Sequence, residues 1–161
     1  MRDKIVNYIR AGYPGIYIVS HEEQRVEAEI KSVADALEYR LFAWSTTAGL
    51  VDTADGQARQ ANDPLDAIEA VEELPENSLV LLRDFHAFLE DGNPVLVRAL
   101  KDSLARCKTL GKCLIILGCR QVLPAELERE LCVIHFTLPD KPQLGVVLDG
   151  ICQSAGLPIA A

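Results

Sequence analysis

An α/β fold is the architecture that the sequence predicts, with helices on both faces of a parallel sheet of five strands. Short apolar runs of strand length alternate with longer segments in which apolar residues recur every three or four positions. The short runs contain few polar residues, as expected for strands that are buried on both faces of a parallel sheet. Because strands and helices alternate through five repeats, a three-layer α/β/α sandwich is the expected fold.

The first half of the chain contains two of the predicted strands. Ser20 and Glu23 have the spacing of a capping box at the start of the helix between them. Residues 46–63 are rich in small and polar residues and lack periodicity, which predicts a long loop. The predicted order is helix 2–11, strand 16–19, helix 21–38, strand 40–45, loop 46–63 and helix 63–73.

The second half of the chain contains the other three strands. Pro94 at the start and Gly111 at the end are typical boundaries of the long helix in this half. The predicted order is strand 78–82, helix 94–110, strand 112–117, a short helix 124–130, strand 132–136 and a helix from 140 to about 154.

Composition excludes several classes of protein. The formal net charge of −8 argues against nonspecific nucleic-acid binding, which requires Lys and Arg to neutralise phosphates. No apolar run reaches the roughly 20 residues of a membrane helix, and the charged first ten residues do not resemble a signal peptide. We therefore expect a cytoplasmic or plastid-stromal protein. The five cysteines include no CxxC pair, which indicates reduced, buried thiols.

The turn after the first strand lacks the residues of a phosphate-binding loop. Such a loop needs glycines that let backbone N–H groups approach phosphates, together with a Lys and a Ser or Thr. Here Ser20 and His21 are followed by two glutamates, which would repel a triphosphate at that helix N-terminus. The motif GxxxxGK[ST] is also absent from the rest of the chain.

Polar residues follow two other predicted strands at the edge where open parallel sheets bind ligands. Asp84 has the place of a magnesium-binding carboxylate, or else it caps the turn that follows. Cys119 and Arg120 end the next strand, where an Arg could contact a γ-phosphate. Cys119 as a nucleophile would need a nearby base, and His86 is the candidate.

Two of the predicted strands look like strands of the large subdomain of AAA+ ATPases. Residues 79–85, Leu-Val-Leu-Leu-Arg-Asp-Phe, resemble a degenerate Walker B strand, and residues 114–119, Leu-Ile-Ile-Leu-Gly-Cys, resemble the sensor-1 strand. The resemblance implies a RecA/AAA+-like sheet with strand order 5-1-4-3-2 that has lost its P-loop. Phe85 stands in place of the Walker B Glu, and Cys119 in place of the sensor Asn.

Three stretches resemble a narrower group, the hypothetical chloroplast reading frame type of AAA+ proteins. They are residues 13–23, 44–50 and 84–89. The first module of that two-part family lacks an intact Walker A motif, and a downstream module carries the ATPase motifs. The resemblance implies an AAA+-like domain with a degenerate nucleotide site over residues 1–139. Residues 140–161 would then start a lid helix or a linker to a second module.

The resemblance also suggests a function. It implies no cofactor for this chain and ATP with magnesium in a parent protein, whose hydrolysis the downstream module supplies. The nucleotide-facing positions would be Ser20, His21, Asp84, Cys119 and Arg120.

Three hypotheses about function follow from the sequence. The first is a non-catalytic module for assembly, regulation or recruitment, with a downstream AAA+ module or further copies of itself as partners. A loop from Trp44 to Gly56 is the candidate contact for another protein. The second is a small enzyme that uses Asp84, His86 and Cys119, and the third is nucleotide binding without hydrolysis.

Overall fold

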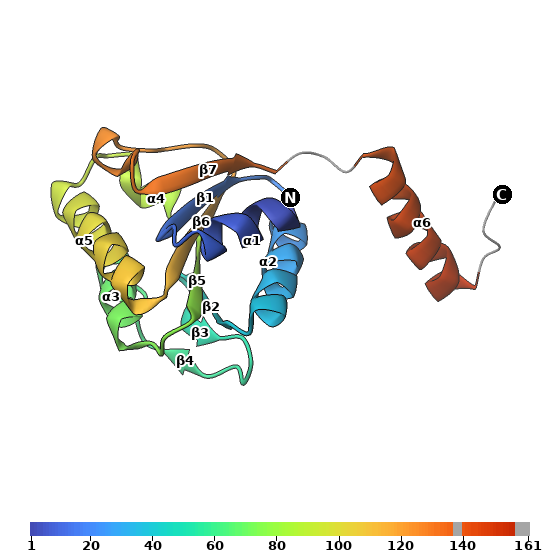
Figure 1. Ribbon diagram of the computed structural model, residues 1–161, viewed down its shortest axis with the longest axis horizontal. Helices are drawn as coiled ribbons and strands as arrows, with labels where there is room; N and C mark the ends of the chain where they lie inside the picture. Colours follow the sequence, from blue (N-terminus) through green and yellow to red (C-terminus); the bar gives the residue numbers. More distant parts are fainter. Residues whose placement is uncertain (137–139, 157–161) are drawn as a thin grey trace.

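The computed structural model describes residues 1–136 and 140–156 and has the predicted α/β class (Figure 1). Its strands are β1 (Gly15–Val19), β2 (Arg40–Ser45), β3 (Gly49–Asp52), β4 (Ala58–Arg59), β5 (Ser78–Arg83), β6 (Cys113–Gly118) and β7 (Leu131–His135). Its α-helices are α1 (Arg2–Arg10), α2 (Glu23–Leu37), α3 (Pro64–Ala70), α4 (His86–Leu89), α5 (Pro94–Leu110) and α6 (Lys141–Ala155). Two short 3-10 helices, η1 (Val71–Glu73) and η2 (Ala125–Leu127), complete the described elements.

The strands form one sheet in the order β4-β3-β2-β5-β6-β1-β7. Strands β7, β1, β6, β5 and β2 are parallel to one another, whereas β3 and β4 are antiparallel additions at one edge. The predicted number of five strands was therefore too small, and the predicted loop 46–63 was wrong where β3 and β4 lie within it. Gly49 turns the chain into β3 with a φ of 73°, and a Cβ there would lie 2.4 Å from the Arg59 carbonyl oxygen.

Helices cover both faces of the sheet, as Figure 1 shows. Alternate strand residues point to opposite faces, so each strand contributes to two separate cores. On one face α1 and α2 pack with residues such as Ile16, Leu81 and Ile115. On the other face α3 and α5 pack with residues that include Tyr17 and Val80. The result is the expected three-layer sandwich.

Trp44 belongs to the second core. Its side chain is fully buried, and its indole N–H donates a hydrogen bond to the Ala61 carbonyl. Its ring meets Phe85 edge to face, with the centroids 5.6 Å apart, and Phe88 at 6.0 Å. Trp44 is thus part of β2 and anchors the residues after β5, so it cannot belong to an exposed contact loop.

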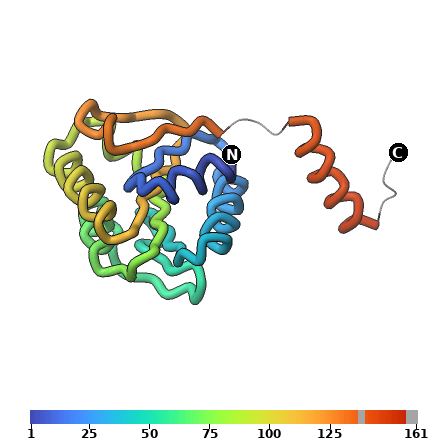
Figure 2. Tube along the Cα trace, in the orientation of Figure 1, coloured from blue at the N-terminus to red at the C-terminus, as the bar shows by residue number. Residues whose placement is uncertain are grey.

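Helix α6 differs from the other long helices because it has no buried residue. Figure 2 shows it beyond the sandwich, on the side of α2, and the Arg25 side chain donates a hydrogen bond to Gln143 across 3.5 Å. Asp140 and Gln143 form a capping box at its start. The helix predicted from residue 140 is therefore present. Residues 137–139 and 157–161, at the predicted domain boundary and in the tail, lie outside the described residues.

Candidate functional site

The turn between β1 and α2 is short and contains no glycine. It consists of Ser20, His21 and Glu22. The Ser20 backbone N–H donates to the Gly118 carbonyl across 2.9 Å, and the Ser20 hydroxyl accepts the Glu22 N–H at 3.0 Å. Glu22, not Ser20, is the N-cap residue of α2, so the predicted capping box with Glu23 does not form. His21 is exposed.

Carboxylates fill the space beside the first turns of α2. The Arg83 guanidinium, at the end of β5, donates two hydrogen bonds to Glu27, one of them across 3.0 Å. Glu23 lies 4.0 Å from the same guanidinium. The hydrogen bond to Glu27 raises the pKa of Arg83 above its usual value, although partial burial opposes the shift. Two carboxylates therefore share the single positive charge of Arg83 at this edge of the sheet.

Asp84 follows β5 with an unusual backbone. Its φ of 53° lies in the left-handed region, which Asp tolerates better than most residues. Its backbone N–H donates to the Leu117 carbonyl across 2.9 Å, and its carbonyl accepts the Ala87 N–H at 3.1 Å. The predicted capping by its side chain is not seen: α4 has no side-chain cap. The Asp84 carboxylate is exposed.

His86 and Cys119 come together, as the sequence suggested. The Cys119 sulfur lies 3.8 Å from His86 Nε2, within hydrogen-bond distance for sulfur. His86 is 7 % exposed and its Nδ1 has no hydrogen-bond partner among the described residues, whereas Cys119 is exposed. A Cβ on Gly118 would lie 2.4 Å from Nδ1, so glycine at this position makes room for the imidazole.

Tyr17, a buried residue of β1, reaches the segment after β6 with its hydroxyl, and sequence reasoning missed it. Its hydroxyl donates to the Arg120 carbonyl at 2.8 Å and accepts the Val122 N–H at 3.0 Å. Burial raises the pKa of Tyr17, although the bond from Val122 acts in the opposite direction. Tyr17 thus fixes the segment that carries Cys119. The one available signal was a hydroxyl within the otherwise apolar run of β1.

The predicted nucleotide-facing positions have different surroundings. Ser20 is joined to the end of β6 by its backbone, and Asp84 to the same strand through Leu117. The Arg120 side chain forms an ion pair with Glu90. Across residues 1–136 and 140–156, no three His, Cys, Asp or Glu side chains are placed to hold a metal ion. None of the helices in these ranges is long and apolar enough to cross a membrane.

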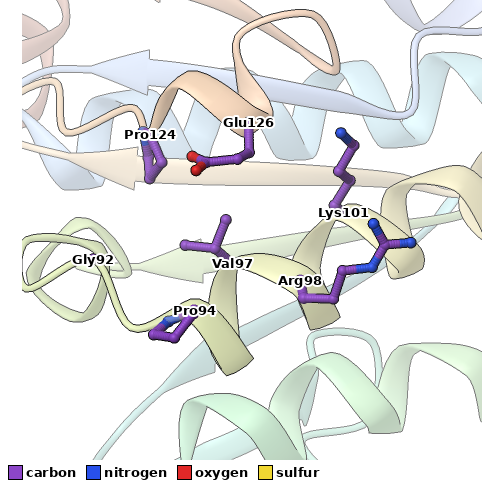
Figure 3. Close-up of a pocket in the computed structure, with 7 residues that line it drawn as sticks. All are labelled: Gly92, Pro94, Val97, Arg98, Lys101, Pro124 and Glu126. Carbon is purple, nitrogen blue, oxygen red and sulfur yellow. The ribbon is translucent and has the colours of Figure 1, made fainter.

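A pocket of about 280 Å³ lies away from these residues, between α5 and the segment around η2 (Figure 3). In Figure 3 Val97 and Pro94 approach it from α5, and Pro124 and Glu126 face them from the other side. Arg98 and Lys101 complete a lining of mixed charge. None of the predicted site residues lines this pocket.

Solved proteins with the same fold include a branch migration motor and an AAA domain. The Thermotoga maritima RuvB Holliday junction branch migration motor aligns with a TM-score of 0.60 at 11% identity, covering 96% of this chain and 50% of that one. The AAA domain of FIGL-1 in complex with ADP gives a TM-score of 0.56 at 13% identity, covering 95% of this chain and 53% of that one. At these identities the likeness concerns the fold alone.

Relatives in sequence carry the same family name as the predicted resemblance. The chain is 31% identical over 160 residues to the uncharacterized AAA domain-containing protein ycf46 of Trieres chinensis, covering 98% of this chain and 32% of that protein. The ycf46 protein of Guillardia theta is 30% identical over 151 residues, covering 92% of this chain and 29% of that protein. The chain thus spans about a third of the length of these relatives. Residues 1–136 match the model of the SpoVK-like AAA ATPase N-terminal domain, and the chain belongs to that family.

Proposed function

We propose that this chain is a non-catalytic AAA+-like module that acts in assembly, regulation or partner recruitment beside an active ATPase module. The observation that carries the proposal is the bidentate pair of Arg83 and Glu27 beside the β1–α2 turn. In a P-loop protein this helix N-terminus receives the phosphates, through glycine N–H groups and a lysine. Here a glutamate that is paired with an arginine lies beside this helix N-terminus instead.

The charge of the turn also supports the proposal. Glu22 and Glu23 stand at the start of α2, where the positive end of the helix dipole would otherwise attract phosphate. Glu22 is paired with Arg25 at 2.6 Å, and Glu23 lies beside Arg83. A bound triphosphate would have to displace these carboxylates from their cations and approach a backbone that contains no glycine. We therefore expect neither ATP nor magnesium to bind this chain.

The proposal about partners rests on the greater length of the relatives. Because the relatives are about three times as long, the ATPase motifs, with ATP and magnesium, would lie in the remaining part of such a protein. The partner is then a downstream AAA+ module or a second copy of the chain. The exposed turns next to β3, at residues 46–48 and 53–57, replace Trp44 as the proposed contact for another protein.

Titration calorimetry of the purified chain with Mg-ATP and Mg-ADP tests the proposal. We expect no heat of binding up to millimolar nucleotide. Micromolar affinity would contradict the proposal and support nucleotide binding without hydrolysis. In that event Asp84→Ala, which removes the exposed carboxylate, shows whether the Walker B position takes part. Turnover of ATP by this chain alone would refute the proposal entirely.

The role in assembly needs a test of its own. In a full-length relative whose matching segment is replaced by this chain, we expect deletion of residues 1–136 to change the oligomeric state or the ATPase rate, measured by sedimentation and phosphate release. Exchanging Glu27→Gln and Arg83→Gln together is the matched control, because it removes the internal pair without removing the module. Unchanged assembly and rate after the deletion would contradict the role.

One observation favours a second function, a small enzyme at the strand ends. The 3.8 Å approach of Cys119 to His86 places a thiol and an imidazole within hydrogen-bond distance, as a thiol nucleophile and a partner histidine would be. This hypothesis predicts that any activity found in a substrate screen is lost in both Cys119→Ala and Asp84→Ala. An activity that survives both substitutions would rule it out.

A further inference from the structure

The pair of Cys119 and His86 has a property that the proposed function does not use. Cys119 is exposed at the end of β6, and its sulfur reaches His86 Nε2 at 3.8 Å. His86 itself is buried, with only 7 % of the residue exposed. An accessible thiol is thus held against a buried, fixed ring.

The surroundings of His86 decide which ring nitrogen carries the proton. Nδ1 is buried, faces the backbone of Gly118 and has no partner among the described residues. A buried N–H without an acceptor is costlier than an unused lone pair, because orphaned donors are the rarer defect in proteins. The neutral ring therefore keeps its proton on Nε2, where the N–H points to the Cys119 sulfur.

This hydrogen bond favours reaction at sulfur. A thiol must lose its proton before it attacks, and the resulting thiolate accepts a hydrogen bond more strongly than the neutral thiol does. Tyr17 holds the segment after Cys119 through the Arg120 carbonyl and the Val122 N–H, so the sulfur stays in place.

The other cysteines are less suited to react. Burial raises the pKa of the thiols of Cys107, Cys113 and Cys132, so that each stays protonated. Cys152 is partly exposed on α6, and among the described residues its thiol makes no hydrogen bond to an imidazole. Selectivity for Cys119 therefore has a structural basis that combines exposure with the neighbouring donor.

We propose that Cys119 is a site of reversible modification by low-molecular-weight disulfides, with His86 as the hydrogen-bond donor that stabilises the attacking sulfur. The Cys119 sulfur attacks one sulfur of the small disulfide, and a new sulfur–sulfur bond forms while the old one breaks. The leaving thiolate takes up the proton that Cys119 lost. Cys119 is oxidised into a mixed disulfide, one half of the small disulfide is reduced and leaves as a free thiol, and the other half stays in the new sulfur–sulfur bond. The proposal is independent of the proposed function.

The test uses oxidised glutathione on the folded 161-residue chain, with intact mass and peptide mapping to follow each cysteine over time. Cys119→Ser should abolish the first adduct. The matched control is Gln121→Cys in the Cys119→Ser background, which places a thiol on the same exposed segment without an imidazole contact. We expect Cys119 to react roughly tenfold faster than this control thiol.

His86→Phe, in each of the two backgrounds, tests the role of the imidazole. It should slow Cys119 to the rate of the control thiol and leave the control thiol unchanged, whereas a general loosening of the segment would change both rates. If His86→Phe does not fold, as circular dichroism would reveal, the comparison of Cys119 with the control thiol still decides. Equal rates for those two thiols, or first modification at Cys152, would overturn the proposal.

Discussion

Gly118→Ala should destabilise the protein through one contact. An added Cβ would lie 2.4 Å from Nδ1, 3.0 Å from Cγ and 3.1 Å from Cε1 of His86. Ordinary contacts begin near 3.5 Å, so the ring would have to move by about 1 Å. His86 is buried, and overpacking of this kind costs about 1–3 kcal/mol. For a domain of this size, a loss of about 2 kcal/mol lowers the Tm by roughly 4–8 °C.

Urea unfolding followed by the fluorescence of Trp44, the single tryptophan, measures this loss. Gly150→Ala is the matched control, because a Cβ there meets nothing within 4 Å. In a His86→Ala background the clash is removed, so the cost of Gly118→Ala should fall by at least about 1 kcal/mol. If Gly118→Ala cost as much free energy of unfolding in that background as in the wild-type chain, or cost none in the wild-type chain, the reasoning would be refuted.

Three further predictions concern stability. Lys112→Met should lower the free energy of unfolding by about 2–4 kcal/mol, because the buried Lys112 ammonium donates to the Val71 and Glu72 carbonyls, both at 3.0 Å. In the same urea unfolding measurement, the control Lys108→Met at an exposed position should have an effect under about 0.5 kcal/mol. Equal effects of the two substitutions would contradict this prediction. Burial raises the pKa of Tyr17 in the folded state, so the neutral phenol stabilises the folded protein. This stabilisation is complete below the usual pKa of 10.0 and is lost as pH rises through the higher folded value. Urea midpoints between pH 8 and 11 should therefore fall less steeply in Tyr17→Phe than in wild type, and identical slopes would argue against a buried phenol. Asp84→Gly should be neutral or stabilising by up to about 1 kcal/mol, whereas Asp84→Val should cost about 1–2 kcal/mol, since the φ of 53° suits glycine and not a β-branched residue; the reverse order of the two midpoints would show that the side chain matters more than the backbone.

The fold was largely predictable because buried strands of a parallel sheet consist of consecutive apolar residues, which are recognisable in the sequence. Residues 114–117 of β6, for example, are all apolar and all buried. The hairpin of β3 and β4 was missed because β4 has only two residues, both exposed, and carries no periodic pattern. The burial of Trp44 was missed for the same reason, since its partner Ala61 lies in the segment that had been interpreted as a loop.

The candidate site was predictable only where it depends on topology. Asp84, His86 and Cys119 share an edge because they follow neighbouring parallel strands, and the order of elements indicates this. The contact of Arg83 with Glu27 joins residues 56 positions apart, and that of Tyr17 with Arg120 joins residues 103 positions apart. Charged and hydroxyl side chains occur in many surroundings, so neither pair leaves a recognisable pattern in one sequence.

The separation of core and edge explains why the fold of this module does not depend on a phosphate site. The two cores are built from strand interiors, such as Ile18, Val80 and Ile116, which are fully buried. The polar residues of the edge begin only where these strands end, so they contribute little to the apolar area that stabilises the sheet. Glycines and a lysine at the β1–α2 turn can thus be replaced by glutamates at little cost, provided that a cation balances them. Arg83 supplies that cation from the end of β5, which is why the proposed non-catalytic function rests on its pair with Glu27.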